Sequence, residues 1–291
     1  MSTAEIRGKL TPSEETAEDL LTSEIFDALG VLPWPWSSRW LSKAKTLDEK
    51  TLSDRLDGTP RTSEHKIIYW PWLDGKCAIV PGCEPDIVLY IDGVCILIEM
   101  KLFSGKSGSG MAESTDSDGC RKSILGDQLG RQWFAGKFLK SGKVYLEGAR
   151  PIRDWAVVYV TRDYQMPVHD LEISVESTRS VIDLMKEEFS SLGDLAEIRD
   201  RLYWVNYEAL YVSLSNQNRI GDGPPLIEKK LSENLLRLLT YKGFAPFEGL
   251  LCPSTSESKL FRAFHFEEKG TISWPHIDRS AFVPFQFRAG G

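Results

Sequence analysis

Two apolar runs separated by an Asp-Gly pair are the feature that most restricts how this chain can fold. The runs cover residues 84–91 and 94–101, and Asp92-Gly93 lies between them. A two-residue type I′ turn requires positive φ at both loop positions, and Asp-Gly is one of the pairs that favours it. The sequence therefore predicts a β-hairpin with Asp92 and Gly93 as its loop.

This loop fixes which residues of the two strands face each other. Asp86 is placed opposite Glu99, and Glu84 is placed opposite Lys101. Opposed residues share a sheet face, as do residues two apart on one strand. Three carboxylates and one ammonium are thus expected at one end of one face. The other strand positions are apolar on both faces, as in a covered sheet. Charges at such a place are costly, so we expect them to have a function.

The order Pro85-Asp86, a short spacer and then Glu99-x-Lys101 resembles the motif of the PD-(D/E)xK nuclease superfamily. The resemblance covers residues 84–140. It implies an α/β fold with a restriction-endonuclease-like mixed β-sheet flanked by helices, here with N-terminal and C-terminal additions. An ordinary hairpin with a surface ion pair at its open end is the alternative interpretation.

The resemblance also implies a chemistry. Asp86 and Glu99, with the carbonyl of Met100, would bind Mg²⁺ (or Mn²⁺), since hard divalent cations prefer oxygen ligands. Lys101 would position the attacking water or stabilise charge on the phosphate. The resemblance implies the activity of a Mg-dependent deoxyribonuclease, a phosphodiester hydrolase, and within that class a DNA endonuclease with a role in restriction or defence.

A helix is predicted after this motif. Leu125, Leu129 and Trp133 recur every four residues, which indicates an amphipathic helix over 124–134. Many members of the superfamily carry a glutamine here that faces the active site. Gln128 matches that place best, and Gln132 is the substitute. The alternative is that both glutamines are solvated polar residues.

Two basic residues are candidate contacts to nucleic acid. Lys106 lies in a Gly/Ser-rich segment, 102–123, which is predicted to be a flexible loop near the site. Arg131 lies beside the glutamines on the predicted helix. It would contact a phosphate or pair with Asp127 four residues earlier, and the ion pair is the favoured interpretation.

Further candidates lie nearer the N-terminus. A helix is predicted over 13–29. In the superfamily the first core helix often carries a glutamate that reaches the metal site, and Glu24 matches it. The alternative is that Glu24 lies on a solvated face of the helix. Glu64, at the start of a strand predicted over 65–73, is a second candidate ligand. Trp70 and Trp72 would stack on bases or, as the favoured interpretation, pack as core or lid.

The remaining pattern sets the expected organisation. Residues 1–218 are predicted to form a nuclease-like domain, with a core at about 13–30 and 64–206. Residues 219–291 are predicted to form a helical, aromatic-rich extension packed on that core. We expect a compact aromatic loop over 32–40, a central strand over 155–161, a helix over 180–190 and a short strand over 203–206.

Charge and cysteine content indicate which partners the protein binds and in which compartment it is expected. The 291-residue chain has a formal net charge of −7, but residues 101–162 hold eleven Lys and Arg against six Asp and Glu. A locally basic site on an acidic protein is compatible with nucleic acid, expected to be DNA. Five cysteines without metal-binding spacing, and no apolar run long enough to span a bilayer, indicate a cytoplasmic protein without membrane contact. A homodimer is left open.

Two other functions fit the same pattern. One is a catalytically inactive nuclease-fold module that binds nucleic acid or a protein partner. The joint presence of Asp86, Glu99, Lys101 and Gln128 argues against it, because binding alone does not require all four. The other is an unrelated metal-dependent or carboxylate enzyme acting on a small molecule, for which a closed pocket rather than an open groove is expected.

Overall fold

A computed structural model describes residues 14–57, 59, 64–74, 79–102, 111–115, 121–146, 151–185, 195–219 and 223–246. The chain divides into two compact units, Met1–Pro246 and Phe247–Gly291. The second unit lies outside the described residues. The last described helix, α9 (Leu226–Tyr241), belongs to the first unit.

A five-stranded mixed sheet with the order β1-β2-β3-β6-β7 forms the centre of the first unit. Strands β1, β2 and β3 pair antiparallel, whereas β3, β6 and β7 run parallel to one another. The strands are β1 (His65–Tyr69), β2 (Ile87–Ile91), β3 (Val94–Lys101), β6 (Asp154–Thr161) and β7 (Leu202–Asn206). The hairpin strands β2 and β3 are buried on both faces and, apart from Glu99 and Lys101, hold no charged residue, as expected for a covered sheet.

The hairpin has the predicted turn and register. Asp92 and Gly93 have φ values of 44° and 80°, so both loop residues have positive φ, as a type I′ turn requires. Ile87 pairs with Ile98 at one end of the ladder, and Ile91 pairs with Val94 at the other. The register prediction is therefore confirmed throughout β2.

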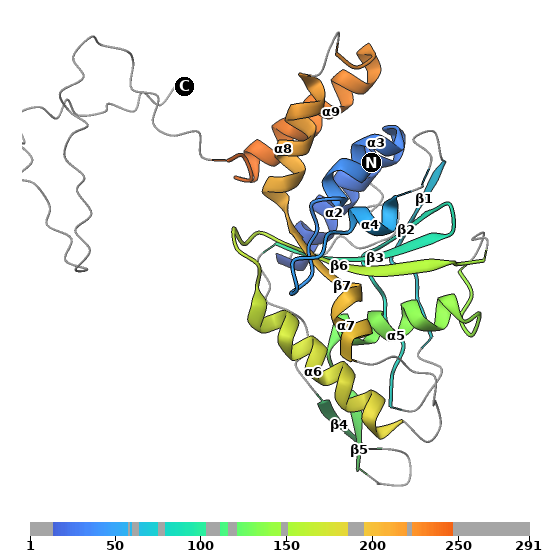
Figure 1. Cartoon of the computed structure of the whole chain (residues 1–291). Helices are drawn as coiled ribbons and strands as arrows, with labels where there is room; N and C mark the ends of the chain where they lie inside the picture. The colour runs from blue at the N-terminus through green and yellow to red at the C-terminus, as the bar shows by residue number, and fades with distance from the viewer. Residues whose placement is uncertain are drawn as a thin grey trace, which may run out of the picture. The chain divides into compact units, whose positions relative to one another are not determined.

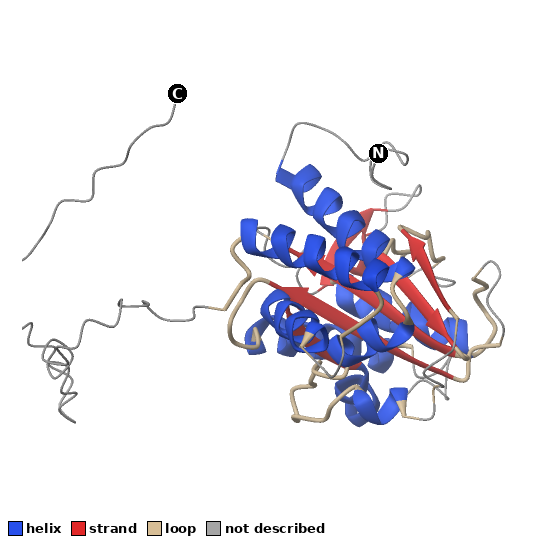
Figure 2. Cartoon of the chain, turned by 90° about the horizontal axis from the view of Figure 1, so that it is seen from above, coloured by secondary structure: helices blue, strands red, loops and turns tan. Residues whose placement is uncertain are grey.

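Helices cover both faces of the sheet (Figure 1). One face packs on α2 (Glu14–Val31), α3 (Trp34–Leu41), α8 (Tyr207–Asn218) and α9, and the short α4 (Ser53–Leu56) joins this layer. The other face packs on α5 (Gln128–Lys140), α6 (Val168–Leu184) and α7 (Leu195–Arg201). The view from above shows the strands between these helices (Figure 2). The chain is thus an α/β protein with a mixed sheet flanked by helices, as predicted.

The aromatic segment at 32–40 is a helix, so the prediction of a loop was wrong. α3 begins at Trp34, and Pro35 lies in its first turn, where a backbone N–H would have no partner within the helix. Trp36 and Trp40 are four residues apart and both are buried. The prolines were misleading because they mark a helix start here rather than a break.

Three other predicted boundaries were wrong. The segment predicted as a flexible loop contains β4 (Met111–Thr115) and β5 (Arg121–Leu125), which pair with each other. α5 therefore begins at Gln128, where the side chain of Asp127 caps the helix by accepting from the Gly130 N–H. The strand from His65 ends at Tyr69, because Trp70 has a φ of 45°.

α6 begins at Val168 rather than at residue 180. Its buried stripe alternates apolar residues with Ser174, Ser177 and Thr178, whose hydroxyl groups bond to backbone carbonyls in the preceding turn. Because these buried residues are polar, they interrupt the apolar period by which a helix is recognised in a sequence. In the described part of the chain, no helix is both long and apolar enough to cross a membrane.

Candidate active site

Asp86 lies directly before β2, at the open end of the hairpin. Its backbone carbonyl accepts a hydrogen bond of 3.0 Å from the Trp70 N–H, which continues the sheet by one residue. Its carboxylate Oδ2 accepts from the Met100 N–H at 2.7 Å. Asp86 is thus held across from the end of β3, where the hairpin register placed it.

Glu99 is the most buried acidic residue of the site, with 1% of its surface exposed. Its Oε1 lies 2.8 Å from the Nζ of Lys101, two residues further along the same strand. Its Oε2 accepts from the side-chain amides of Gln128 at 2.9 Å and Gln132 at 2.6 Å. Both glutamines predicted for this role therefore reach the site, because they lie one turn apart at the start of α5.

A second carboxylate, Glu18 of α2, also holds Lys101. Glu18 Oε1 lies 3.1 Å from Lys101 Nζ, and its Oε2 accepts from the Leu102 N–H at 2.8 Å. The sequence pattern pointed to Glu24 in this helix and not to Glu18. The two are six residues apart, which places them about 120° apart around the helix, and the role of Glu24 stays a prediction.

A signal for Glu18 was present in the sequence. Leu21, Ile25 and Leu29 form the buried stripe of α2. Extending that stripe by one turn toward the N-terminus reaches Glu18, because residues three and four apart share a helix face. An acidic residue in line with an apolar stripe is directed toward the protein interior.

Burial has the largest single influence on the pKa values of Asp86, Glu99 and Lys101. Loss of solvent, reinforced by the negative charge of Glu99, raises the pKa of Asp86 well above its usual range. Loss of solvent also raises the pKa of Glu99, although the charge of Lys101 opposes this. Burial alone would lower the pKa of Lys101, but the charges of Glu99 and Asp86 outweigh it and raise that pKa. Lys101 is therefore protonated at neutral pH.

The site lies at the carboxyl end of the parallel strands. Lys101 pairs with Thr161 at the end of β6, and Thr161 pairs with Asn206 at the end of β7. Open α/β sheets bind their ligands at this edge. Glu64, in contrast, precedes His65, which pairs with Ile91 at the turn end of the hairpin, so the strand register separates it from Asp86.

The two predicted nucleic-acid contacts have different outcomes. Arg131 lies on α5, one residue before Gln132, and its Nη1 donates to the Gly82 carbonyl at 3.3 Å. Its predicted ion pair with Asp127 stays a prediction; the Asp127 carboxylate accepts from the Gly130 N–H and from Ser174 Oγ. Lys106 lies outside the described residues.

The charge of the group and its donor atoms suit a divalent cation. Three carboxylates, those of Glu18, Asp86 and Glu99, face one ammonium, so two negative charges are in excess when all are ionised. Carboxylate oxygens are the ligands that Mg²⁺ and Mn²⁺ prefer. Across the described ranges, however, no three Asp, Glu, His or Cys side chains are arranged as a ready-made metal site. Lys101 occupies the position between Glu18 and Glu99.

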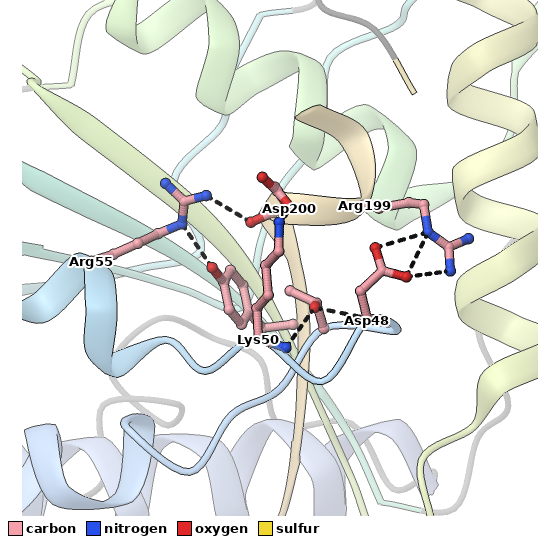
Figure 3. A network of polar contacts seen from close by, with 7 residues as sticks. Asp48, Lys50, Arg55, Arg199 and Asp200 are labelled. Carbon is pink, nitrogen blue, oxygen red and sulfur yellow. Dashed lines mark hydrogen bonds and ion pairs between the residues drawn. The ribbon is translucent and has the colours of Figure 1, made fainter. Parts of the chain in front are cut away.

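A cavity of about 440 Å³ lies at the opposite edge of the sheet, where β3 and β6 begin. Lys50, Arg55 and Arg153 line it, and each is paired, with Asp200, Asp154 and Asp92 respectively. Figure 3 shows part of this network, in which Arg55 also donates to the Asp200 carbonyl. Because its cations are already neutralised, we do not place the active site there.

Comparisons of the chain with protein-family models, with curated proteins and with solved structures gave no match.

Proposed function

We propose that this chain is a metal-dependent nuclease of the PD-(D/E)xK type that hydrolyses phosphodiester bonds, with DNA as its substrate. The observation that supports the proposal is the buried group of Asp86, Glu99 and Lys101 at the carboxyl end of the parallel strands. Glu18 and Gln128 add to it from the two helix layers. A purely structural ion pair would not require so many buried charges in one place.

Lys101 acts in this proposal as a fixed positive charge. Its raised pKa keeps it protonated, so it does not serve as a general base at neutral pH. Two carboxylates hold its Nζ in place. A pre-oriented ammonium stabilises negative charge that develops on a phosphate, or donates a hydrogen bond to the attacking water.

The two acidic residues are held in place differently. Glu99 is fixed by the two glutamine amides on Oε2. Asp86 is fixed through Oδ2 by the Met100 N–H. Asp86 and Glu99 would hold the cation. When bound, the cation supplies Lewis-acid polarisation of the phosphate and lowers the pKa of a water.

The test is cleavage of supercoiled plasmid, linear duplex and single-stranded DNA with Mg²⁺ or Mn²⁺. Wild type is compared with Asp86→Asn and Lys101→Met, and Asp92→Asn is the matched control. Asp92 lies at the other end of the same hairpin, and asparagine tolerates its positive φ. We expect metal-dependent cutting that is lost at least about 100-fold in both site variants and retained in the control.

Two results would contradict the proposal. Cutting that survives both site variants would place the activity elsewhere or in a contaminant. No cutting of any substrate by a folded wild-type protein, with either metal, would favour the inactive binding module instead.

A further inference from the structure

Trp72 is an exposed aromatic side chain close to the candidate active site. It follows β1, and 66% of its surface is exposed, whereas its neighbour Trp70 is buried. Its indole N–H donates to Asp74 Oδ1 at 3.2 Å, which fixes the direction of the ring. A large exposed ring that is held in one orientation differs from an ordinary mobile surface side chain.

The backbone of Gly82 lies against the Trp72 ring. A Cβ added at Gly82 would lie 2.5 Å from Cζ2 and 2.9 Å from Cε2 of Trp72. The indole therefore lies so close to the Gly82 backbone that a side chain at this position would require the ring to shift. Because 66% of the Trp72 surface is exposed, the part of the ring that does not contact Gly82 is open to solvent.

A short series of contacts joins this ring to the active site. Leu73 and Cys83 exchange backbone hydrogen bonds of 2.8 and 2.9 Å, and the Trp70 N–H bonds to the Asp86 carbonyl. The segment that carries Trp72 therefore runs beside the segment that ends at Asp86. On the other side, the Gly82 carbonyl accepts from Arg131, which lies on α5 between the two glutamines that bind Glu99.

We propose that Trp72 is a stacking platform for an unpaired base, so that the preferred substrate of this site is single-stranded nucleic acid. Arg131, beside it, contacts the adjacent phosphate. An indole face stacks on a base only where the base is not already stacked within a duplex. Because Gly82 and Asp74 hold the ring, little side-chain freedom is lost on binding. The nuclease part of this inference rests on the proposed function.

Binding is measured first, without cleavage, in EDTA. The probes are fluorescein-labelled oligo-dT and oligo-U and a hairpin duplex of the same length, followed by fluorescence anisotropy. The variants are Trp72→Ala, Trp72→Phe and Gly82→Ala. Tyr145→Ala is the control, because Tyr145 is an even more exposed aromatic, at 87%, that lies beyond the opposite end of α5.

We expect Trp72→Ala to weaken single-strand binding by about 5- to 150-fold and duplex binding by less than about twofold. Trp72→Phe should keep most of the affinity, because it keeps a stacking face. Gly82→Ala should weaken binding as Trp72→Ala does, because it displaces the ring. Tyr145→Ala should bind as wild type does. Preference between oligo-dT and oligo-U then tells which single strand is the ligand.

Wild type that binds no single strand, or Trp72→Ala that binds as wild type does, would overturn the inference. Equal losses on single strand and duplex would also overturn it. Trp72-dependent binding without hydrolysis under any metal would support the stacking platform and reject the nuclease. Conversely, hydrolysis that is lost in Asp86→Asn but has an unchanged KM in Trp72→Ala would support the nuclease and reject the platform.

Discussion

The Nζ of Lys101 lies 3.1 Å from Oε1 of Glu18, a residue 83 positions earlier in the chain. This contact joins the first described helix to the end of β3, and the Leu102 N–H strengthens it by bonding to the second oxygen of the same carboxylate. Lys101 is therefore held by Glu18, from the helix layer that contains α2, as well as by Glu99 on its own strand. The position of the Lys101 ammonium therefore depends on how α2 packs on the sheet.

The first prediction compares two glutamates of α2. Glu18→Gln keeps an oxygen that accepts from the Leu102 N–H but removes the charge that holds Lys101. We expect its nuclease activity to fall by about 10- to 100-fold, whereas Glu24→Gln retains most of the activity. Initial rates of cleavage of plasmid and single-stranded DNA under saturating Mg²⁺ measure this. A larger loss in Glu24→Gln than in Glu18→Gln would show that Glu24 is the helix acid instead.

The second prediction concerns stability and pH. Burial and the charge of Glu99 raise the pKa of Asp86 above its usual value of 3.8. A raised carboxyl pKa stabilises the fold below that usual value, and this contribution is lost as pH rises through the raised pKa. Asp86→Asn lacks the charge and retains an acceptor for the Met100 N–H.

We therefore expect Asp86→Asn to be inactive but more stable than wild type at pH 7, by about 0.5–2 kcal/mol. The difference in the free energy of unfolding should shrink toward pH 4. Urea unfolding in EDTA across this pH range measures it. A difference that does not change with pH would show that Asp86 is not a buried titrating group.

The third prediction tests the close approach of α5 to the sheet. A Cβ at Gly136 would lie 2.3 Å from Cε3 of Trp155, a fully buried ring of β6. Gly136→Ala should destabilise the fold by about 1–3 kcal/mol, because overpacking outweighs the gain in helix propensity. At Gly30 of α2 the nearest atom is the flexible Cδ1 of Ile67 at 3.2 Å, so Gly30→Ala should be neutral or stabilising. Thermal unfolding of the two alanine variants separates these effects.

The fourth prediction separates stability from activity. Arg201 pairs with Asp154 and donates to the Trp155 carbonyl at 2.6 Å, at the edge of the sheet away from the active site. Only 11% of the Arg201 side chain is exposed. Arg201→Met should cost about 2–4 kcal/mol of stability, since it leaves a half-buried Asp154 with one fewer partner.

The exposed pair Lys45–Glu49 is the control for this change. Both of its side chains are about half or more exposed to solvent. Lys45→Met should cost less than about 1 kcal/mol. The nuclease activity of both variants, measured well below their melting temperatures, should match wild type. A loss of activity in folded Arg201→Met would show that the two edges of the sheet are coupled.

Local pattern was enough to predict the centre of the site. Asp86 and Met100 are 14 positions apart, and the Asp-Gly turn alone fixes that they meet. The helix that carries the two glutamines followed from a four-residue apolar period, and their place at the site was an expectation from the resemblance to the nuclease superfamily. Helix α3 was mispredicted for the opposite reason, because its prolines carry meaning only once the position of the helix start is known.

The sequence by itself determined the hairpin, its register and the pairing of Asp86 with the end of β3, because turn chemistry and the two-residue period of a strand act over short distances. Only the tertiary structure decided that Glu18 reaches Lys101 and that Trp72 rests on Gly82. The first contact depends on how α2 packs on the sheet, and the second on the backbone bridge between Leu73 and Cys83, and no local period encodes either approach.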